Sequence, residues 1–185
     1  MRKNFGKKSW LYPMPVFIVG TYDENGVPNA MNAAWGGMYD TNLVMVCLAD
    51  EHKTTENIRK NGAFTVSFAT AETVVPSDYV GIVSGNDTPD KLCRSGFHTT
   101  KSEYVNAPLI DELPMAVECK LYKFTEDGIC ISEIINISAD ESILDENGTV
   151  DAKKLNPIVY DSVSHAYWTL GEKAGQAFSD GKRIK

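Results

Sequence analysis

The stretch Asn29-Ala30-Met31-Asn32-Ala33-Ala34-Trp35-Gly36-Gly37 decides the fold of this chain and contains its first candidate site. It predicts a strand that runs out into a tight turn of small residues beside one large aromatic side chain. Small residues let backbone amides approach the polar edge of a flat ligand, and the two glycines permit unusual turns. We therefore expect residues 31–35 to form a wall for a planar ligand, with Trp35 either beside that ligand or packed in the core.

Strand patterns continue on both sides of this stretch. Residues 16–22 are apolar and β-branched, and the turn sequence Asp23-Glu24-Asn25-Gly26 that follows them predicts a hairpin. Residues 115–124 and 129–137 bracket Glu126-Asp127-Gly128 and predict a second hairpin. Many strands joined by hairpin turns indicate a mainly β fold, an antiparallel barrel that is closed or nearly closed.

Two more strands and three short helices complete the expected fold. Residues 43–48 are apolar throughout, which predicts a strand buried on both faces, whereas residues 63–68 alternate and predict one buried face. Helices are expected over residues 54–61, 72–83 and 87–94, as peripheral covers of the barrel ends. The apolar face of the second helix is expected to consist of Val75, Tyr79 and Ile82.

The length of 185 residues fits one domain, 1–185, with a barrel core over roughly residues 13–140 and a C-terminal extension over roughly residues 141–185. Hydrophobic residues at 43% and charged residues at 23% are typical of a globular protein. No apolar run approaches the ~20 residues that span a bilayer, and no signal-peptide core is recognisable, so a cytoplasmic location without membrane contact is expected.

The net charge of -7 argues against a nucleic-acid surface, which would have to neutralise phosphates. Four cysteines without a CxxC pair argue against a zinc site, and no metal ligand is expected. The chain also lacks the glycine-rich patterns of Rossmann and P-loop nucleotide sites. With three histidines and no convincing triad, no catalytic acid or base is expected.

The charged run Asp50-Glu51-His52-Lys53-Thr54-Thr55 opens the first expected helix. Helix openings leave unpaired N–H groups and a partial positive charge, so they bind anions, and His52, Lys53 and Thr54 add polar side chains there. This pattern indicates a phosphate site. Thr54 as a plain N-cap and Lys53 as a solvated surface lysine would explain the same residues without a ligand, and both interpretations stay open at this point.

Several ordered motifs resemble the flavin reductase-like family, close to its flavoredoxin branch, over nearly the whole chain. The residues that carry the resemblance are Pro15-Val16, Val19-Gly20-Thr21, Gly26-x-Pro28-Asn29-x-Met31-x-x-Ala34-Trp35, His52-x-Thr54-x-x-Asn57-Ile58, and Tyr79-Val80-Gly81-x-x-Ser84-Gly85 with Asp90-Lys91. The resemblance implies a split β-barrel that binds FMN without a covalent bond. It also implies a homodimer with each flavin near the subunit boundary.

Carried onto this sequence, the resemblance puts the flavin ring against the backbone of Met31, Asn32, Ala33, Ala34 and Trp35. It puts the phosphate around His52, Lys53 and Thr54, with Ser84 and Lys91 as further candidates for the cofactor. Many members of the family have serine or threonine where Asn32 or Ala33 stands in this chain. The amide of Asn32 is expected to take the place of that hydroxyl.

The function that the resemblance implies is an FMN-binding oxidoreductase that moves electrons from NAD(P)H or a protein donor to an acceptor. A pure electron carrier and a flavin-free binding module remain alternatives. In the tail, His165 either meets substrate or lies on the surface. The aromatic residues near it either stack on a nicotinamide or pack as core and dimer contacts: Tyr160, Tyr167 and Trp168.

Overall fold

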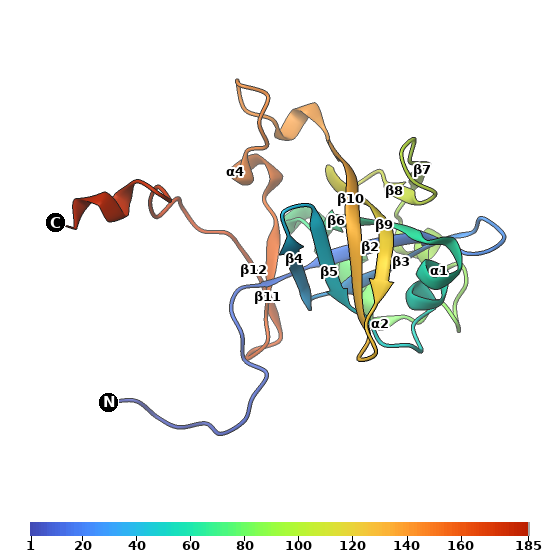
Figure 1. Ribbon diagram of the computed structural model, residues 1–185, viewed down its shortest axis with the longest axis horizontal. Helices are drawn as coiled ribbons and strands as arrows, with labels where there is room; N and C mark the ends of the chain where they lie inside the picture. The colour runs from blue at the N-terminus through green and yellow to red at the C-terminus, as the bar shows by residue number, and fades with distance from the viewer. Residues whose placement is uncertain (185) are drawn as a thin grey trace.

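A curled antiparallel sheet of seven strands forms the body of the protein in the computed structural model, which describes residues 1–184 (Figure 1). β3 and β4 lie at the two ends of the strand order but are separated by two residues in the chain, so the sheet must curl to bring its ends together. The mainly β fold with peripheral helices is confirmed. The strands in spatial order are β3 (Pro28–Ala33), β2 (Phe17–Tyr22), β6 (Ala63–Phe68), β9 (Met115–Phe124), β10 (Ile129–Ala139), β5 (Leu43–Cys47) and β4 (Gly36–Asp40).

Both predicted hairpins are present. β2 pairs with β3 so that Tyr22 faces Pro28, and Gly26 adopts a left-handed conformation with φ of 79° in the connecting turn. β9 pairs with β10, and Gly128 takes a φ of 86° in the turn between them. In both turns a glycine adopts the positive φ that the turn requires, so the local sequence determines where each hairpin turns.

The predicted burial of two strands is wrong, and the arrangement of the sheet explains why. β5 alternates between buried and half-buried residues, because Val44 and Val46 face the barrel core whereas Met45 and Cys47 line the cavity beside the N-terminal segment. β6 is buried on both faces, since it lies between β2 and β9 and its outer face is covered by β8 (Pro108–Ile110). Thr65 of β6 donates a hydrogen bond of 2.6 Å to the carbonyl of Pro108.

The glycine pair after Trp35 begins strand β4, whereas the sequence predicted a turn there. Gly36 pairs with Val46, and a Cβ at Gly36 would lie 2.7 Å from the carbonyl oxygen of Met45. Glycine is therefore required at this position for close pairing of β4 with β5. Only Ala34 and Trp35 connect β3 to β4.

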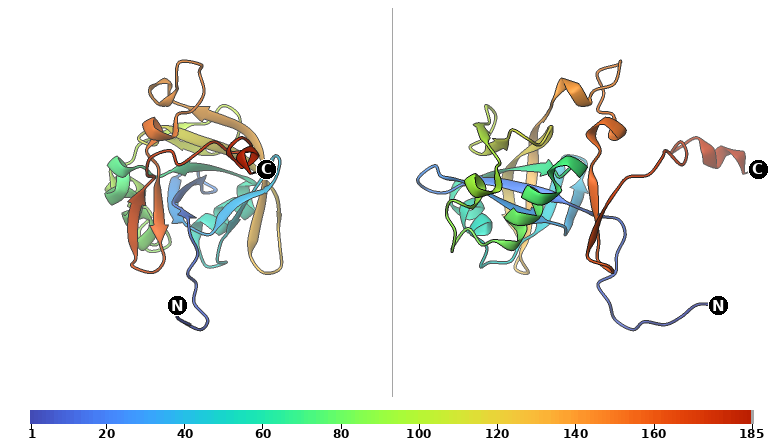
Figure 2. Two further views of the ribbon diagram at one scale, coloured as in Figure 1. Left: turned by 90° about the vertical axis from the view of Figure 1, so that its left-hand side faces the viewer. Right: turned by 180° about the vertical axis from the view of Figure 1, so that it is seen from behind.

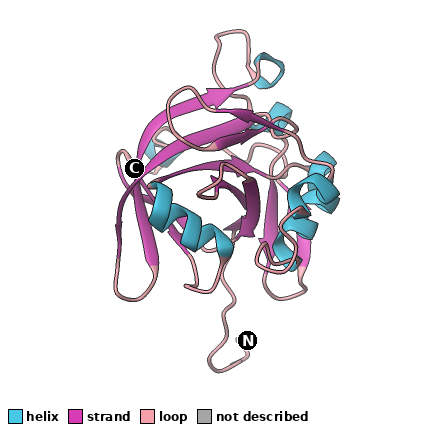
Figure 3. Cartoon of the chain, turned by 90° about the vertical axis from the view of Figure 1, so that its right-hand side faces the viewer, coloured by secondary structure: helices cyan, strands magenta, loops and turns pink. Residues whose placement is uncertain are grey.

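The helices lie around the outside of the sheet, as Figure 3 shows. α1 (Lys53–Asn61) ends at Gly62, where φ is 67°, as predicted. α2 (Val74–Ile82) follows a 3-10 turn at Ala71–Thr73, and α3 (Lys91–Ser95) starts four residues later than expected. Smaller helical pieces are α4 (Ala152–Leu155) and the 3-10 turns at Glu141–Ile143 and Asp180–Arg183.

The predicted apolar face of α2 is wrong. Val75 and Ile82 are 79% and 75% exposed, while Ser77 and Val80 are the residues that α2 buries. Val80 packs in a cluster with Ile18, Leu92 and others between the sheet and the helices. The misassignment matters for function, because the exposed C-terminal turn of α2 faces the site described below.

Two hydrophobic clusters hold the structure together. One fills the barrel and includes Phe64 and Val46, both completely buried. The other joins the outside of β2 and β3 to α2 and α3. Burial of this apolar surface is the main favourable term in folding.

Two small sheets flank the barrel. β7 (Thr99–Lys101) pairs with β8, and β1 (Met14–Pro15) pairs with β11 (Ile158–Asp161), which pairs with β12 (Ala166–Thr169). The β11–β12 hairpin thus brings the C-terminal region back to the start of the barrel, and both chain ends extend beyond it (Figure 2). Among residues 1–184, no helix has the length and apolar character required to cross a membrane.

Candidate cofactor site

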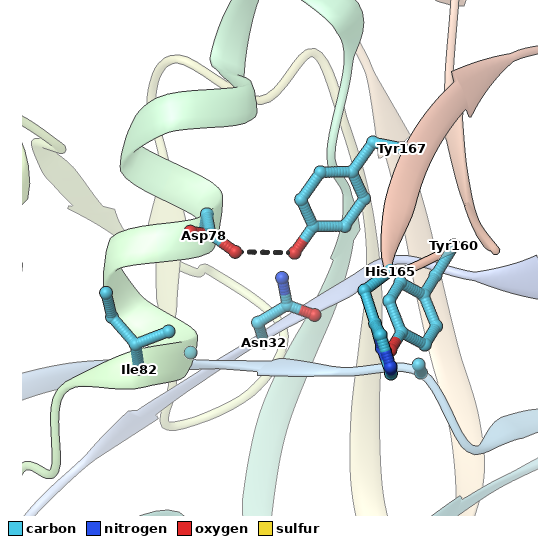
Figure 4. Close-up of a pocket in the computed structure, with 8 residues that line it drawn as sticks. Asn32, Asp78, Ile82, Tyr160, His165 and Tyr167 are labelled. Atoms are coloured by element: carbon cyan, nitrogen blue, oxygen red, sulfur yellow. Dashed lines mark hydrogen bonds between the residues drawn. The ribbon is translucent and has the colours of Figure 1, made fainter. Parts of the chain in front are cut away.

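Two adjacent cavities lie beside the end of β3. The larger has a volume of about 470 Å³ and the smaller about 210 Å³, and both are lined by Asn32, Gly81 and Ile82. The larger lies between α2 and the β11–β12 hairpin, as Figure 4 shows. The smaller lies between the start of α1 and the segment that follows α2. Together they form one cleft, which we call the β3 cleft.

The start of α1 supplies a polar wall to the smaller cavity. His52 occupies the N-cap position without a side-chain capping bond, and its Nδ1 is buried with no hydrogen-bond partner in the described part of the chain. Lys53, about a quarter exposed, forms an ion pair of 3.0 Å with Glu56. An unpartnered buried nitrogen, a lysine and a helix N-terminus in one cavity favour an anionic ligand.

Thr54 does not cap this helix, so the interpretation of Thr54 as a plain N-cap is wrong. Its side chain is 1% exposed, and Oγ1 accepts a hydrogen bond of 2.9 Å from Nδ2 of Asn29. This bond ties the start of α1 to β3, the strand that forms the opposite wall. Thr54 therefore shapes the smaller cavity as well as lining it.

Two glycines, Gly81 in the last turn of α2 and Gly85 after it, bring the backbone close to β3. A Cβ at Gly81 would lie 2.9 Å from Cβ of Asn32, and a Cβ at Gly85 would lie 2.5 Å from Oδ1 of Asn29. Any side chain at either position would displace its neighbour or fill the cleft. The cradle that these glycines leave fits a flat, phosphorylated cofactor, with the phosphate at the α1 end.

Lys91 lines the smaller cavity from α3 and is 3% exposed. Its Nζ donates hydrogen bonds of 3.0 and 2.8 Å to the carbonyl oxygens of Val80 and Val83, at the C-terminal end of α2. Burial lowers the pKa of Lys91 to about 8. Lys91 thus holds the end of α2 in place. Two of its three ammonium protons are used in these bonds, and the third is available for a ligand.

Asn32 stands where the two cavities meet. Its Nδ2 donates a hydrogen bond of 3.1 Å to the carbonyl of Ser77, which ties β3 to α2. The amide oxygen lies on the side of Tyr160 and His165 (Figure 4). Asn32 therefore offers the cleft an acceptor, where a hydroxyl group would offer both a donor and an acceptor.

The structure brings together eight of the ten predicted site residues. Ala33 instead points into the barrel core, 8% exposed, and leaves only its backbone for a ligand. Trp35 is 60% exposed, so it is not a core aromatic, and it lines a separate cavity of about 500 Å³ with the N-terminal segment. Contact with a cofactor remains a prediction for all ten. Those that line the β3 cleft are Met31, Asn32, Ala34, His52, Lys53, Thr54, Ser84 and Lys91.

Sequence reasoning missed the contribution of α2 to the larger cavity. The hydroxyl of Tyr167 donates a hydrogen bond of 2.7 Å to Oδ1 of Asp78. Burial, together with this carboxylate, raises the pKa of Tyr167 to about 12. No local pattern marks Asp78, because its partner lies 89 residues along the chain. In residues 1–184, no three His, Cys, Asp or Glu side chains gather in a way that would hold a metal ion.

Comparison with known proteins agrees with this geometry. The structure matches the flavoredoxin of Desulfovibrio vulgaris (Miyazaki F) with a TM-score of 0.95 and 38% sequence identity, over 98% of this chain and 100% of the other. A flavoredoxin from Methanosarcina acetivorans matches over the full length of both chains, with a TM-score of 0.91 and 29% identity.

A more distant match, an FMN-binding domain of a flavin reductases-like enzyme from Shewanella baltica OS155, has a TM-score of 0.79 and 22% identity over 88% of each chain. At that identity the likeness shows the shared fold alone, which is the split barrel of this group. Residues 9–165 match the family model described as "Flavin reductase like domain". The chain therefore belongs to the flavin reductase-like family.

Proposed function

We propose that this protein is an FMN-dependent oxidoreductase that passes electrons from NAD(P)H, or from a protein donor, through bound FMN to an acceptor. The observation that carries the proposal is the β3 cleft, which joins a cationic, phosphate-sized end to a larger end lined by aromatic side chains. Flavoredoxins are similar to this chain over essentially its whole length.

The residues present fit FMN at both ends of the cleft. The phosphate would be held by the N-terminus of α1 with His52 and Lys53, and the ring would rest on the backbone of residues 31–34. Bound FMN supplies the electron and hydride chemistry. The protein positions the reactants and limits access of water, while Lys91 places a cation at the cavity wall.

The decisive experiment for an enzyme is reduction of the bound flavin by NADH or NADPH without oxygen. We expect rapid loss of the oxidised flavin absorbance with at least one of the two nucleotides in stopped-flow measurements. The larger cavity is open to a second planar molecule, which such a hydride transfer requires. Free FMN mixed with the same nucleotide sets the uncatalysed rate.

If neither nucleotide bleaches the bound flavin faster than free FMN, the protein is not an NAD(P)H oxidoreductase. An electron carrier that is reduced by a protein partner would then account for the same cleft. Titration with dithionite distinguishes that case from damaged protein, because a competent carrier still accepts electrons reversibly.

We also propose that the protein is a homodimer formed through the face that carries Trp35. Trp35, Met38 and Tyr39 are 60%, 60% and 51% exposed on and beside the edge strand β4. The N-terminal segment adds Trp10 and Leu11, and the cavity of about 500 Å³ lies between this segment and β4. Exposed apolar surface of this kind, rich in large aromatic residues, marks protein interfaces.

A further inference from the structure

The charges of the two cavities assign them different ligands. Lys53 and Lys91 line the smaller cavity; the ammonium of Lys53 also pairs with Glu56, and that of Lys91 with two backbone carbonyls. The larger has one carboxylate, Asp78, and that carboxylate already accepts the hydroxyl proton of Tyr167. A phosphate group is therefore favoured in the smaller cavity, whereas the larger cavity favours an uncharged ring.

A hydrogen-bonded pair of side chains faces the larger cavity from the β11–β12 hairpin. The hydroxyl of Tyr160 lies 2.7 Å from Nδ1 of His165, and both residues line the cavity (Figure 4). Tyr160 is half-buried against the ring of Tyr167, with ring centroids 6.0 Å apart, whereas His165 is exposed to solvent. The pair thus connects the cavity to bulk water.

The backbone holds His165 in an unusual conformation. Its φ is 55°, in the left-handed region, which is strained for a residue other than glycine. Asp161 fixes this turn by accepting hydrogen bonds from the backbone N–H groups of Val163 and Ser164, at 2.8 and 3.3 Å. Such strain is typical of positions where function constrains the side chain.

We propose that Tyr160 is a catalytic proton donor to a small, uncharged carbonyl acceptor, a quinone, that binds in the larger cavity. His165 is a positioning residue that supplies the proton to Tyr160. This inference rests on the proposed function, because the reductant is the reduced FMN. It goes beyond that function by naming the acceptor class and the residues that select it.

The step balances as a two-electron reduction. The quinone receives a hydride, which is two electrons and one proton, from the reduced cofactor, and receives a second proton from the Tyr160 hydroxyl. Both carbonyl groups become hydroxyls, and the product is a hydroquinone. His165 then returns a proton to Tyr160 and takes one from water, which its exposure permits.

The direction of the hydrogen bond between Tyr160 and His165 determines whether Tyr160 can donate its hydroxyl proton to the quinone. With a protonated imidazole, Nδ1–H donates to the Tyr160 oxygen and leaves the hydroxyl proton free for the quinone. With a neutral imidazole that accepts at Nδ1, the same proton is committed to His165. The titratable groups around the pair are Asp78, Asp161 and Tyr167.

The test compares Tyr160→Phe with the native protein, using 2-methyl-1,4-naphthoquinone as acceptor. Ferricyanide serves as a second acceptor, because it takes electrons without a proton. We expect the ratio of quinone to ferricyanide turnover to fall about 100-fold in Tyr160→Phe, the usual size of a general-acid contribution. Binding of acetophenone, a carbonyl compound that is not reduced here, should weaken at least twofold by calorimetry.

A matched control and a second variant keep the result interpretable. Tyr122→Phe removes a hydroxyl from a side chain that is 66% exposed on β9 and should change neither measurement. His165→Asn keeps a residue that tolerates positive φ. It should also lower the ratio of quinone to ferricyanide turnover, because asparagine cannot return a proton to Tyr160.

Two outcomes overturn the proposal. One is an unchanged turnover ratio in Tyr160→Phe, and the other is a His165→Asn protein whose ratio of quinone to ferricyanide turnover equals that of native protein. Failure of the proposed function looks different, because native protein would then hold no FMN or would reduce neither acceptor.

Discussion

Replacing Lys53 by alanine together with Thr54 by valine is expected to weaken FMN binding roughly tenfold to a hundredfold. A lost hydrogen bond to a charged group costs about 1.5–3 kcal/mol, and each 1.4 kcal/mol is a factor of ten in Kd. Valine keeps the volume of the buried Thr54 side chain but removes the hydroxyl that accepts from Asn29. Fluorescence titration of apoprotein with FMN measures the change.

Lys60→Ala is the matched control for this double variant. Lys60 is the other lysine of α1, it also pairs with Glu56, and it lies outside the β3 cleft. Its removal should leave FMN affinity within twofold of native. If the double variant binds FMN as tightly as native protein, the phosphate lies elsewhere. A single Lys53→Ala variant, which leaves Thr54 unchanged, separates the loss of the charge from any change in packing at Thr54.

Replacing Trp35 by glutamate is expected to dissociate the proposed homodimer. A buried aromatic anchor at an interface commonly contributes 2 kcal/mol or more, which is a weakening of about thirtyfold. An unpaired carboxylate at the centre of an apolar interface adds a desolvation cost. Sedimentation velocity at micromolar concentration should show dimers for native protein and monomers for Trp35→Glu.

Tyr104→Glu is a suitable control, because Tyr104 is 57% exposed in the connection between β7 and β8, away from β4. It should leave the dimer intact. A native protein that sediments as a monomer contradicts the proposed assembly. A Trp35→Glu protein that remains dimeric contradicts the proposed interface, and Met38 and Tyr39 would then have to be explained separately.

Local sequence determined the parts of the fold that local chemistry controls. The turns at Gly26 and Gly128 and the end of α1 at Gly62 each need a glycine with positive φ, so their positions are readable from the sequence. The burial of β5 and β6 was not readable, because it depends on what covers the outer face of each strand. Gly36 likewise begins a strand because it pairs with Val46, a tertiary contact that no local pattern shows.

The same distinction between local sequence and tertiary contact applies to the candidate site. The grouping of His52, Lys53 and Thr54 at the smaller cavity was predictable, since the three residues are consecutive and open one helix. The larger cavity was not, because it requires α2, β3 and the β11–β12 hairpin to meet. Asp78 and Tyr167 acquire their hydrogen bond only through that tertiary contact.

Lys91 illustrates a third case, in which the residue was predicted and its main contacts were not. The sequence placed it as a candidate cofactor ligand, whereas the structure shows its ammonium bound to the carbonyls of Val80 and Val83. Such a contact between consecutive helices depends on how α3 packs under α2, which no local pattern encodes.

The flavin content of purified protein tests whether the β3 cleft binds FMN. Native protein mixed with FMN and passed through a desalting column should retain visible flavin absorbance at an equimolar ratio of FMN to chain. A colourless protein after this treatment would contradict the claim. The barrel would then have to serve as a flavin-free binding module.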